Sequence, residues 1–168
     1  MNRILLLSVG VLLAVSTALG ADDCLSTVRK VVIPGLRDVV VVAEGEFEPR
    51  SVGSYSLRVY AGTNPRFPYD DFVAGIVRSR DGTVEDVRFS DLDRDGLPDM
   101  IVVIRTAGTG GYLSADAFRL RGTVLMLLGS VSGLPRDADP IGALEAQLAN
   151  RADPRAAPDP DKLRQWAR

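Results

Sequence analysis

The chain has 168 residues with 20 basic and 22 acidic side chains, no histidine and one cysteine, Cys24. This composition removes the commonest general base, the usual zinc ligand and any internal disulfide. No run of Lys or Arg marks a nucleic-acid-binding surface, and neither a G-x-S-x-G elbow nor a phosphate-binding loop occurs. Glutamates such as Glu44 and Glu85 could pair as in a glycosidase, but their spacing selects no site. We therefore expect a binding protein, with an enzyme as the least favoured alternative.

Residues 1–20 have the pattern of a secretory signal peptide. Arg3 precedes an uncharged apolar run over residues 4–19, and small residues stand two positions apart at its end, Ala18 and Gly20. The run is shorter than the roughly 20 residues that span a bilayer, so a retained anchor is the weaker alternative. We predict a mature protein that begins near Ala21, is exported to the periplasm or secreted, and has no membrane attachment after cleavage. Residues 21–36 would form an N-terminal segment.

Residues 37–133 contain short β-prone runs separated by turn residues every 8–12 positions. This pattern predicts an all-β domain, an antiparallel β-sandwich of about seven or eight strands. The apolar runs at residues 39–42 and 101–104 are typical of strands buried on both faces. Asp81-Gly82 is a hairpin signal between two such strands. Exposed sheet edges are compatible with either a monomer or a homodimer.

An aspartate-rich loop follows, with the spacing D-x-D-x-D-G-x-x-D over residues 91–99. Close carboxylates repel one another without a counter-charge, and this spacing resembles the calcium loops between strands of integrin-type repeats. The predicted ligands of a structural Ca²⁺ are four carboxylates and one backbone carbonyl, from Asp91, Asp93, Asp95, Leu97 and Asp99. The alternative is an Asp/Gly-rich turn without metal, partly neutralised by Arg94.

A glycine-rich loop comes next, in the sequence TAGTGGYLSADAF that begins at Thr106. Gly108, Gly110 and Gly111 stand within four positions, beside the hydroxyls of Thr109 and Tyr112. Glycine accepts positive φ and permits close approach of another chain, so this hairpin loop is suited to presentation to a partner. The alternative is an ordinary hairpin turn.

Residues 134–168 form a Pro/Ala-rich tail. Asp139 could cap a helix that starts at Pro140, with Ile141, Leu144 and Leu148 on one side. We interpret the segment as partly helical or disordered and weakly attached.

Three stretches of the chain resemble the periplasmic inhibitors of invertebrate-type (I-type) lysozyme. They are EFEPRSVGSYSLRVY, FVAGIVRSRDGTVEDVRFSDLDRDG and above all RTAGTGGYLSADAF. The resemblance covers about residues 39–129 and excludes the tail. It implies a β-sandwich with a loop that enters the active-site cleft of I-type lysozyme.

The resemblance also implies roles for residues of the glycine loop. The family has a serine followed three positions later by a tyrosine, both implicated in inhibition, and these positions match Thr109 and Tyr112 with Gly110 and Gly111 between them. Thr106 matches an upstream family serine. We therefore predict an exported inhibitor of I-type lysozyme. The alternative is a calcium-dependent surface-binding or adhesion module built around the aspartate loop.

Overall fold

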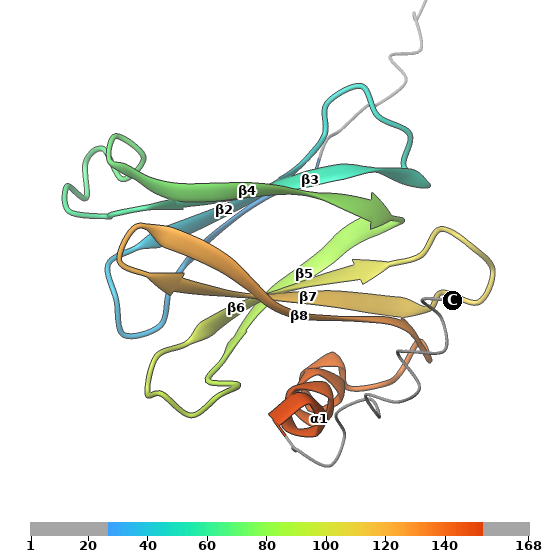
Figure 1. Ribbon diagram of the computed structural model, residues 1–168. Helices are drawn as coiled ribbons and strands as arrows, with labels where there is room; N and C mark the ends of the chain where they lie inside the picture. Colours follow the sequence, from blue (N-terminus) through green and yellow to red (C-terminus); the bar gives the residue numbers. More distant parts are fainter. Residues whose placement is uncertain (1–26, 153–168) are drawn as a thin grey trace, which may run out of the picture.

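The computed structural model describes residues 27–152, which form two four-stranded antiparallel sheets and one helix (Figure 1). The first sheet has the strand order β1-β2-β3-β4 and the second has the order β5-β6-β7-β8. The strands of the first sheet are β1 (Val28–Val32), β2 (Val39–Glu44), β3 (Val52–Tyr60) and β4 (Phe72–Asp81). Those of the second are β5 (Thr83–Ser90), β6 (Asp99–Arg105), β7 (Leu113–Arg121) and β8 (Val124–Leu134). The predicted antiparallel β-sandwich of about seven or eight strands is thereby confirmed, with eight strands.

Each sheet is an up-and-down meander, and the chain changes sheet once, at Gly82. The predicted hairpin at Asp81-Gly82 is wrong, because β4 pairs with β3 and β5 pairs with β6. Glycine is required there for another reason: its φ is +115°, and a Cβ would lie 2.0 Å from the carbonyl oxygen of Arg105. The first sheet also starts earlier than residue 37, because β1 pairs along its whole length with β2.

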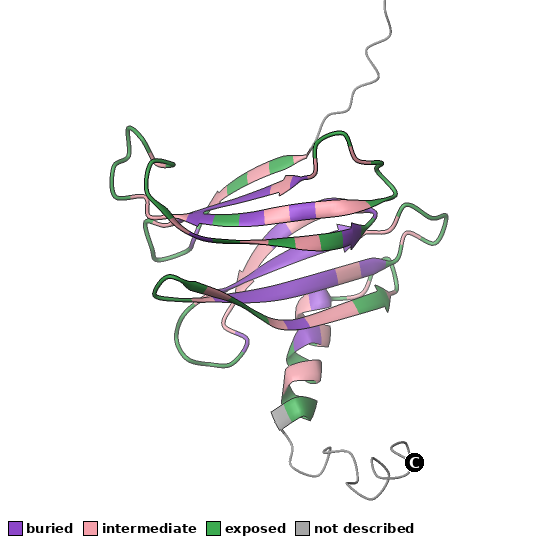
Figure 2. Cartoon of the chain, turned by 45° about the horizontal axis from the view of Figure 1, so that its top comes forward, coloured by how far each residue is buried: buried purple, intermediate pink, exposed green. Residues whose placement is uncertain are grey.

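The main core lies between the two sheets and is built from alternate residues of their facing strands. In Figure 2 the buried residues concentrate on the central strands, whereas the connecting loops are exposed. The first sheet contributes Val40, Val42, Tyr55, Leu57 and Val59 to this core. The second contributes Val84, Val87, Met100, Val102, Ile104 and Phe118.

Helix α1 (Pro140–Ala152) covers the outer face of the second sheet (Figure 1). Asp139 caps it as predicted, because its carboxylate accepts hydrogen bonds from the backbone N–H groups of Ile141 and Gly142, both at 3.1 Å. Leu144 is fully buried against a second apolar cluster that includes Ile101 and Val103. The helix is therefore packed on the domain, and the expectation of a weakly attached segment is wrong for these residues.

No helix among residues 27–152 is both long and apolar enough to cross a bilayer. The predicted signal peptide, residues 1–20, lies outside the described residues, as does Cys24.

Candidate functional site

The glycine loop connects β6 to β7 and projects from one end of the sandwich (Figure 1). Its base is closed by a hydrogen bond from the backbone N–H of Thr106 to the carbonyl of Tyr112, at 2.9 Å. A tight turn forms its tip, where the N–H of Gly111 donates to the carbonyl of Gly108 at 3.1 Å. The loop is thus a short, internally bonded hairpin connection on two central strands.

The side chains at the tip are available to a partner. Thr109 is exposed, and Tyr112 is 52% exposed although it is a large aromatic residue. The Tyr112 ring lies against Gly110, where a Cβ would come within 2.4 Å of a ring carbon. Gly111 has a φ of +54°, a conformation that a residue with a side chain adopts at a cost in energy. The two glycines therefore serve the placement of Tyr112.

Thr106 differs from Thr109 in its environment. Its side-chain oxygen is buried and has no hydrogen-bond partner among residues 27–152. The structure thus brings Thr109, Gly110, Gly111 and Tyr112 together at the loop tip, whereas the Thr106 hydroxyl is buried.

An ion pair that no sequence motif indicates lies at the base of the loop. Arg105, the last residue of β6, pairs with Glu85 of β5 through both of its Nε and Nη2 groups. Hydrogen bonding from Arg105 lowers the pKa of Glu85, and the same interaction raises the pKa of Arg105. Arg105 Nη1 also donates to the carbonyl of Gly111 at 2.8 Å. The guanidinium therefore links a neighbouring strand to the loop.

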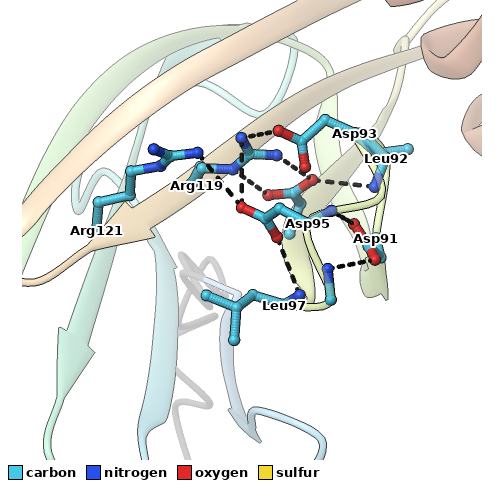
Figure 3. Close-up of polar contacts among 9 residues, drawn as sticks. Asp91, Leu92, Asp93, Asp95, Leu97, Arg119 and Arg121 are labelled. Carbon is cyan, nitrogen blue, oxygen red and sulfur yellow. Dashed lines mark hydrogen bonds and ion pairs between the residues drawn. The ribbon is translucent and has the colours of Figure 1, made fainter.

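The aspartate loop lies before β6 and has a dense network of polar contacts (Figure 3). The Asp91 carboxylate accepts hydrogen bonds from the backbone N–H groups of Asp95 and Gly96, at 3.0 and 2.8 Å. Asp95 accepts a similar bond from the N–H of Leu97, at 3.0 Å. Gly96 has a φ of +86°, which explains the glycine at this turn.

Two arginines of β7 reach this loop from the neighbouring strand (Figure 3). Arg119 binds Asp99 with two nitrogens, at 3.0 and 3.1 Å, and also donates to Asp93. Arg121 lies 3.4 Å from Asp95. Burial raises the pKa of Asp99, whereas the hydrogen bond from Arg119 lowers the pKa of Asp93. The counter-charge that the aspartates require is thus supplied by the protein itself.

The same loop keeps some geometry that a cation could use. One carboxylate oxygen from each of Asp91, Asp93 and Asp99 lies within 4.8 Å of the other two. Two of these three carboxylates are already bound by Arg119, so electrostatic repulsion no longer demands a metal. Calcium at this loop stays a prediction.

The two loops lie at opposite ends of β6. This strand runs from Asp99 to Arg105, so about 20 Å of extended chain separates them. In Figure 1 the 91–98 connection and the 106–112 connection lie at opposite ends of the second sheet. A cation at the aspartate loop could therefore not contact Tyr112.

Comparison with known proteins gives a consistent result. The family model described as the periplasmic lysozyme inhibitor of I-type lysozyme matches residues 26–148. The crystal structure of such an inhibitor from Aeromonas hydrophila is 44% identical, with a TM-score of 0.66, and the match covers 70% of this chain and 98% of that chain. The Aeromonas hydrophila inhibitor in complex with Meretrix lusoria lysozyme gives the same identity and TM-score, with coverages of 71% and 95%. A search of the curated proteins gives no match.

Proposed function

The chain belongs to the family of periplasmic inhibitors of I-type lysozyme, and on this premise we propose that its 106–112 loop enters the active-site cleft of the lysozyme and blocks it. Family membership confirms the inhibitory function, the class of partner and the periplasmic location that the sequence predicted. The proposal concerns the means of inhibition and the residues that provide it.

The observation that carries the proposal is the exposure of Thr109 and Tyr112 at the tip of a loop with well-defined internal bonds. A lysozyme cleft carries two carboxyl groups that flank the scissile bond. A threonine hydroxyl and a tyrosine hydroxyl can each donate a hydrogen bond to such a carboxyl group. The Tyr112 ring would bury apolar surface against the cleft wall, as aromatic anchors do in protein interfaces. Gly110 and Gly111 keep the loop narrow enough for a groove that binds a polysaccharide.

The mechanism needs no reaction catalysed by the inhibitor itself. The chain contains no histidine, and the loop offers hydroxyl groups without a neighbouring base among the described residues. We therefore propose a non-covalent inhibitor that competes with peptidoglycan and has no enzymatic activity. As the inhibitor concentration increases, the apparent KM for peptidoglycan should rise while kcat stays constant.

The test is a pair of substitutions, Thr109→Ala with Tyr112→Ala, measured by inhibition of I-type lysozyme. Loss of two such contacts at an interface should weaken inhibition about 100-fold or more. Both side chains are exposed, so the free energy of unfolding should change by less than about 0.5 kcal/mol.

A matched control lies at the other end of the sandwich. Thr63 and Tyr69 are also exposed, in the connection between β3 and β4. The double variant Thr63→Ala with Tyr69→Ala should inhibit lysozyme like the wild type. If the variant of Thr109 and Tyr112 inhibited as strongly as this control, the assignment of the loop would be wrong.

A further inference from the structure

We propose that Arg105 is a positioning residue for inhibition: held by Glu85, it fixes the carbonyl of Gly111 and thereby the orientation of Tyr112. This inference rests on the proposed function of the loop and names a residue outside it. Neither the glycine pattern nor the hydroxyls of the loop require an arginine at this position.

The geometry of Arg105 suits this role. Two nitrogens of the guanidinium bind Glu85, with Nη2 at 2.7 Å from Oε1, while the remaining nitrogen, Nη1, lies 2.8 Å from the carbonyl oxygen of Gly111. Paired hydrogen bonds between a guanidinium and a carboxylate fix orientation as well as distance. The Arg105 guanidinium is therefore bound to β5 through Glu85 and to the glycine loop through Nη1.

Glu85 reaches this position because of a β-bulge. In the pairing of β5 with β6, Val84 is opposite Ile104 and Asp86 is opposite Val103, so Glu85 is the extra residue. Val84 and Val87 both lie in the core although they are three positions apart, so Glu85 and Asp86 both lie outside it. A bulge redirects a side chain that regular alternation would place elsewhere. The bulge thus supplies a carboxylate beside the end of β6.

The hydrogen bond from Arg105 to Gly111 restrains the backbone directly before Tyr112. The Gly111 carbonyl belongs to the peptide unit that leads into Tyr112, and Gly111 itself has a positive φ. Rotation of this peptide would turn the Tyr112 side chain away from its place against Gly110. A loop held in its binding conformation before association loses less conformational entropy on binding. Arg105 should therefore affect affinity without touching lysozyme.

The experiment measures the affinity for I-type lysozyme of Arg105→Ala in the wild-type background and in the Tyr112→Ala background. In the wild-type background affinity should fall about tenfold. In the Tyr112→Ala background Arg105→Ala should have little further effect, because the side chain that it orients is gone. Glu85→Ala should also weaken binding several-fold, since it releases the guanidinium while Arg105 itself remains.

The matched control is Arg88→Ala on β5. Arg88 also forms an ion pair, with Asp86 at 2.9 Å, and both side chains of this pair are exposed. This substitution should leave affinity unchanged. Wild-type affinity of folded Arg105→Ala would overturn the inference. So would an equal loss in both backgrounds, because Arg105 would then act independently of Tyr112. If Arg105→Ala failed to fold, wild-type affinity of Glu85→Ala would overturn it. Strong inhibition by the variant of Thr109 and Tyr112 would instead refute the proposed function.

Discussion

The substitution Tyr55→Phe removes one oxygen atom from the interior of the sandwich. Tyr55 of β3 is fully buried, and its hydroxyl donates to the Asp116 carboxylate of β7 at 2.5 Å. This hydrogen bond joins the two sheets. Burial raises the pKa of Tyr55, and the neighbouring Asp116 raises it further, so the hydroxyl is a protonated donor at neutral pH.

The expected loss of stability follows from the partners that remain. Asp116 keeps a hydrogen bond from Ser130 and an ion pair with Arg78 at 3.4 Å, so it is not left without a partner. A hydrogen bond to a charged group contributes about 1.5–3 kcal/mol. We expect Tyr55→Phe to lower the free energy of unfolding by about 2 kcal/mol and the Tm by roughly 5–10 °C.

Tyr112→Phe provides the matched control, because it removes the same atom from an exposed tyrosine. Among the described residues the Tyr112 hydroxyl has no hydrogen bond, so the free energy of unfolding should change by less than about 0.5 kcal/mol. Denaturant unfolding and lysozyme inhibition should give opposite results: Tyr55→Phe loses stability and keeps inhibition, whereas Tyr112→Phe keeps stability and inhibits about tenfold more weakly. Equal stability of Tyr55→Phe and the wild type would show that this buried bond does not stabilise the sandwich.

Three further predictions concern the helix, the base of the loop and the aspartate loop. Leu144→Ala should lower the free energy of unfolding by about 2–5 kcal/mol in denaturant titrations, because Leu144 is fully buried; a smaller loss would mean that α1 contributes little. Arg105 lowers the pKa of Glu85, so the stability advantage of the wild type over Glu85→Gln should be complete above pH about 4.3, the ordinary pKa of glutamate. This advantage should disappear as the pH falls through the lower pKa that Glu85 has in the folded protein. An advantage that grew on acidification would contradict this sign. A calcium chelator should leave lysozyme inhibition unchanged in a titration, because the aspartate loop is remote from Tyr112; abolished inhibition would show that a cation at the aspartate loop is needed for binding lysozyme.

The fold could be predicted from the sequence where the pattern is local. Strands with continuous apolar residues, such as residues 39–42, are buried as expected, and Asp139 marks the start of α1. The choice of partner strand at Asp81-Gly82 was not predictable, because it depends on residues far away in the chain. Gly82 is there to admit the backbone of Arg105, a contact between segments more than 20 residues apart that no dipeptide pattern encodes.

The counter-charge of the aspartate loop was also not predicted, for a different reason. Its carboxylates need a positive charge, as their spacing indicates, but the residue that supplies it, Arg119, lies 20 residues after Asp99. A usable signal was present in the hairpin itself. With Arg105 opposite Leu113 and Met100 opposite Phe118, continuing the same register places Asp99 opposite Arg119. Opposite charges at facing positions of antiparallel strands stabilise each other. The register of the β6–β7 hairpin is therefore enough to predict the ion pair between Asp99 and Arg119.

The glycine loop combines small residues with a defined conformation. Gly111 takes a positive φ, and Gly110 leaves room for the Tyr112 ring, so both glycines serve geometry. The closing bond from Thr106 and the bond from Arg105 restrain the backbone on either side of the tip. A loop without these restraints would lose part of its binding free energy in becoming ordered. The loop therefore depends on the strands for its shape, while the exposed hydroxyls remain free to bind a partner.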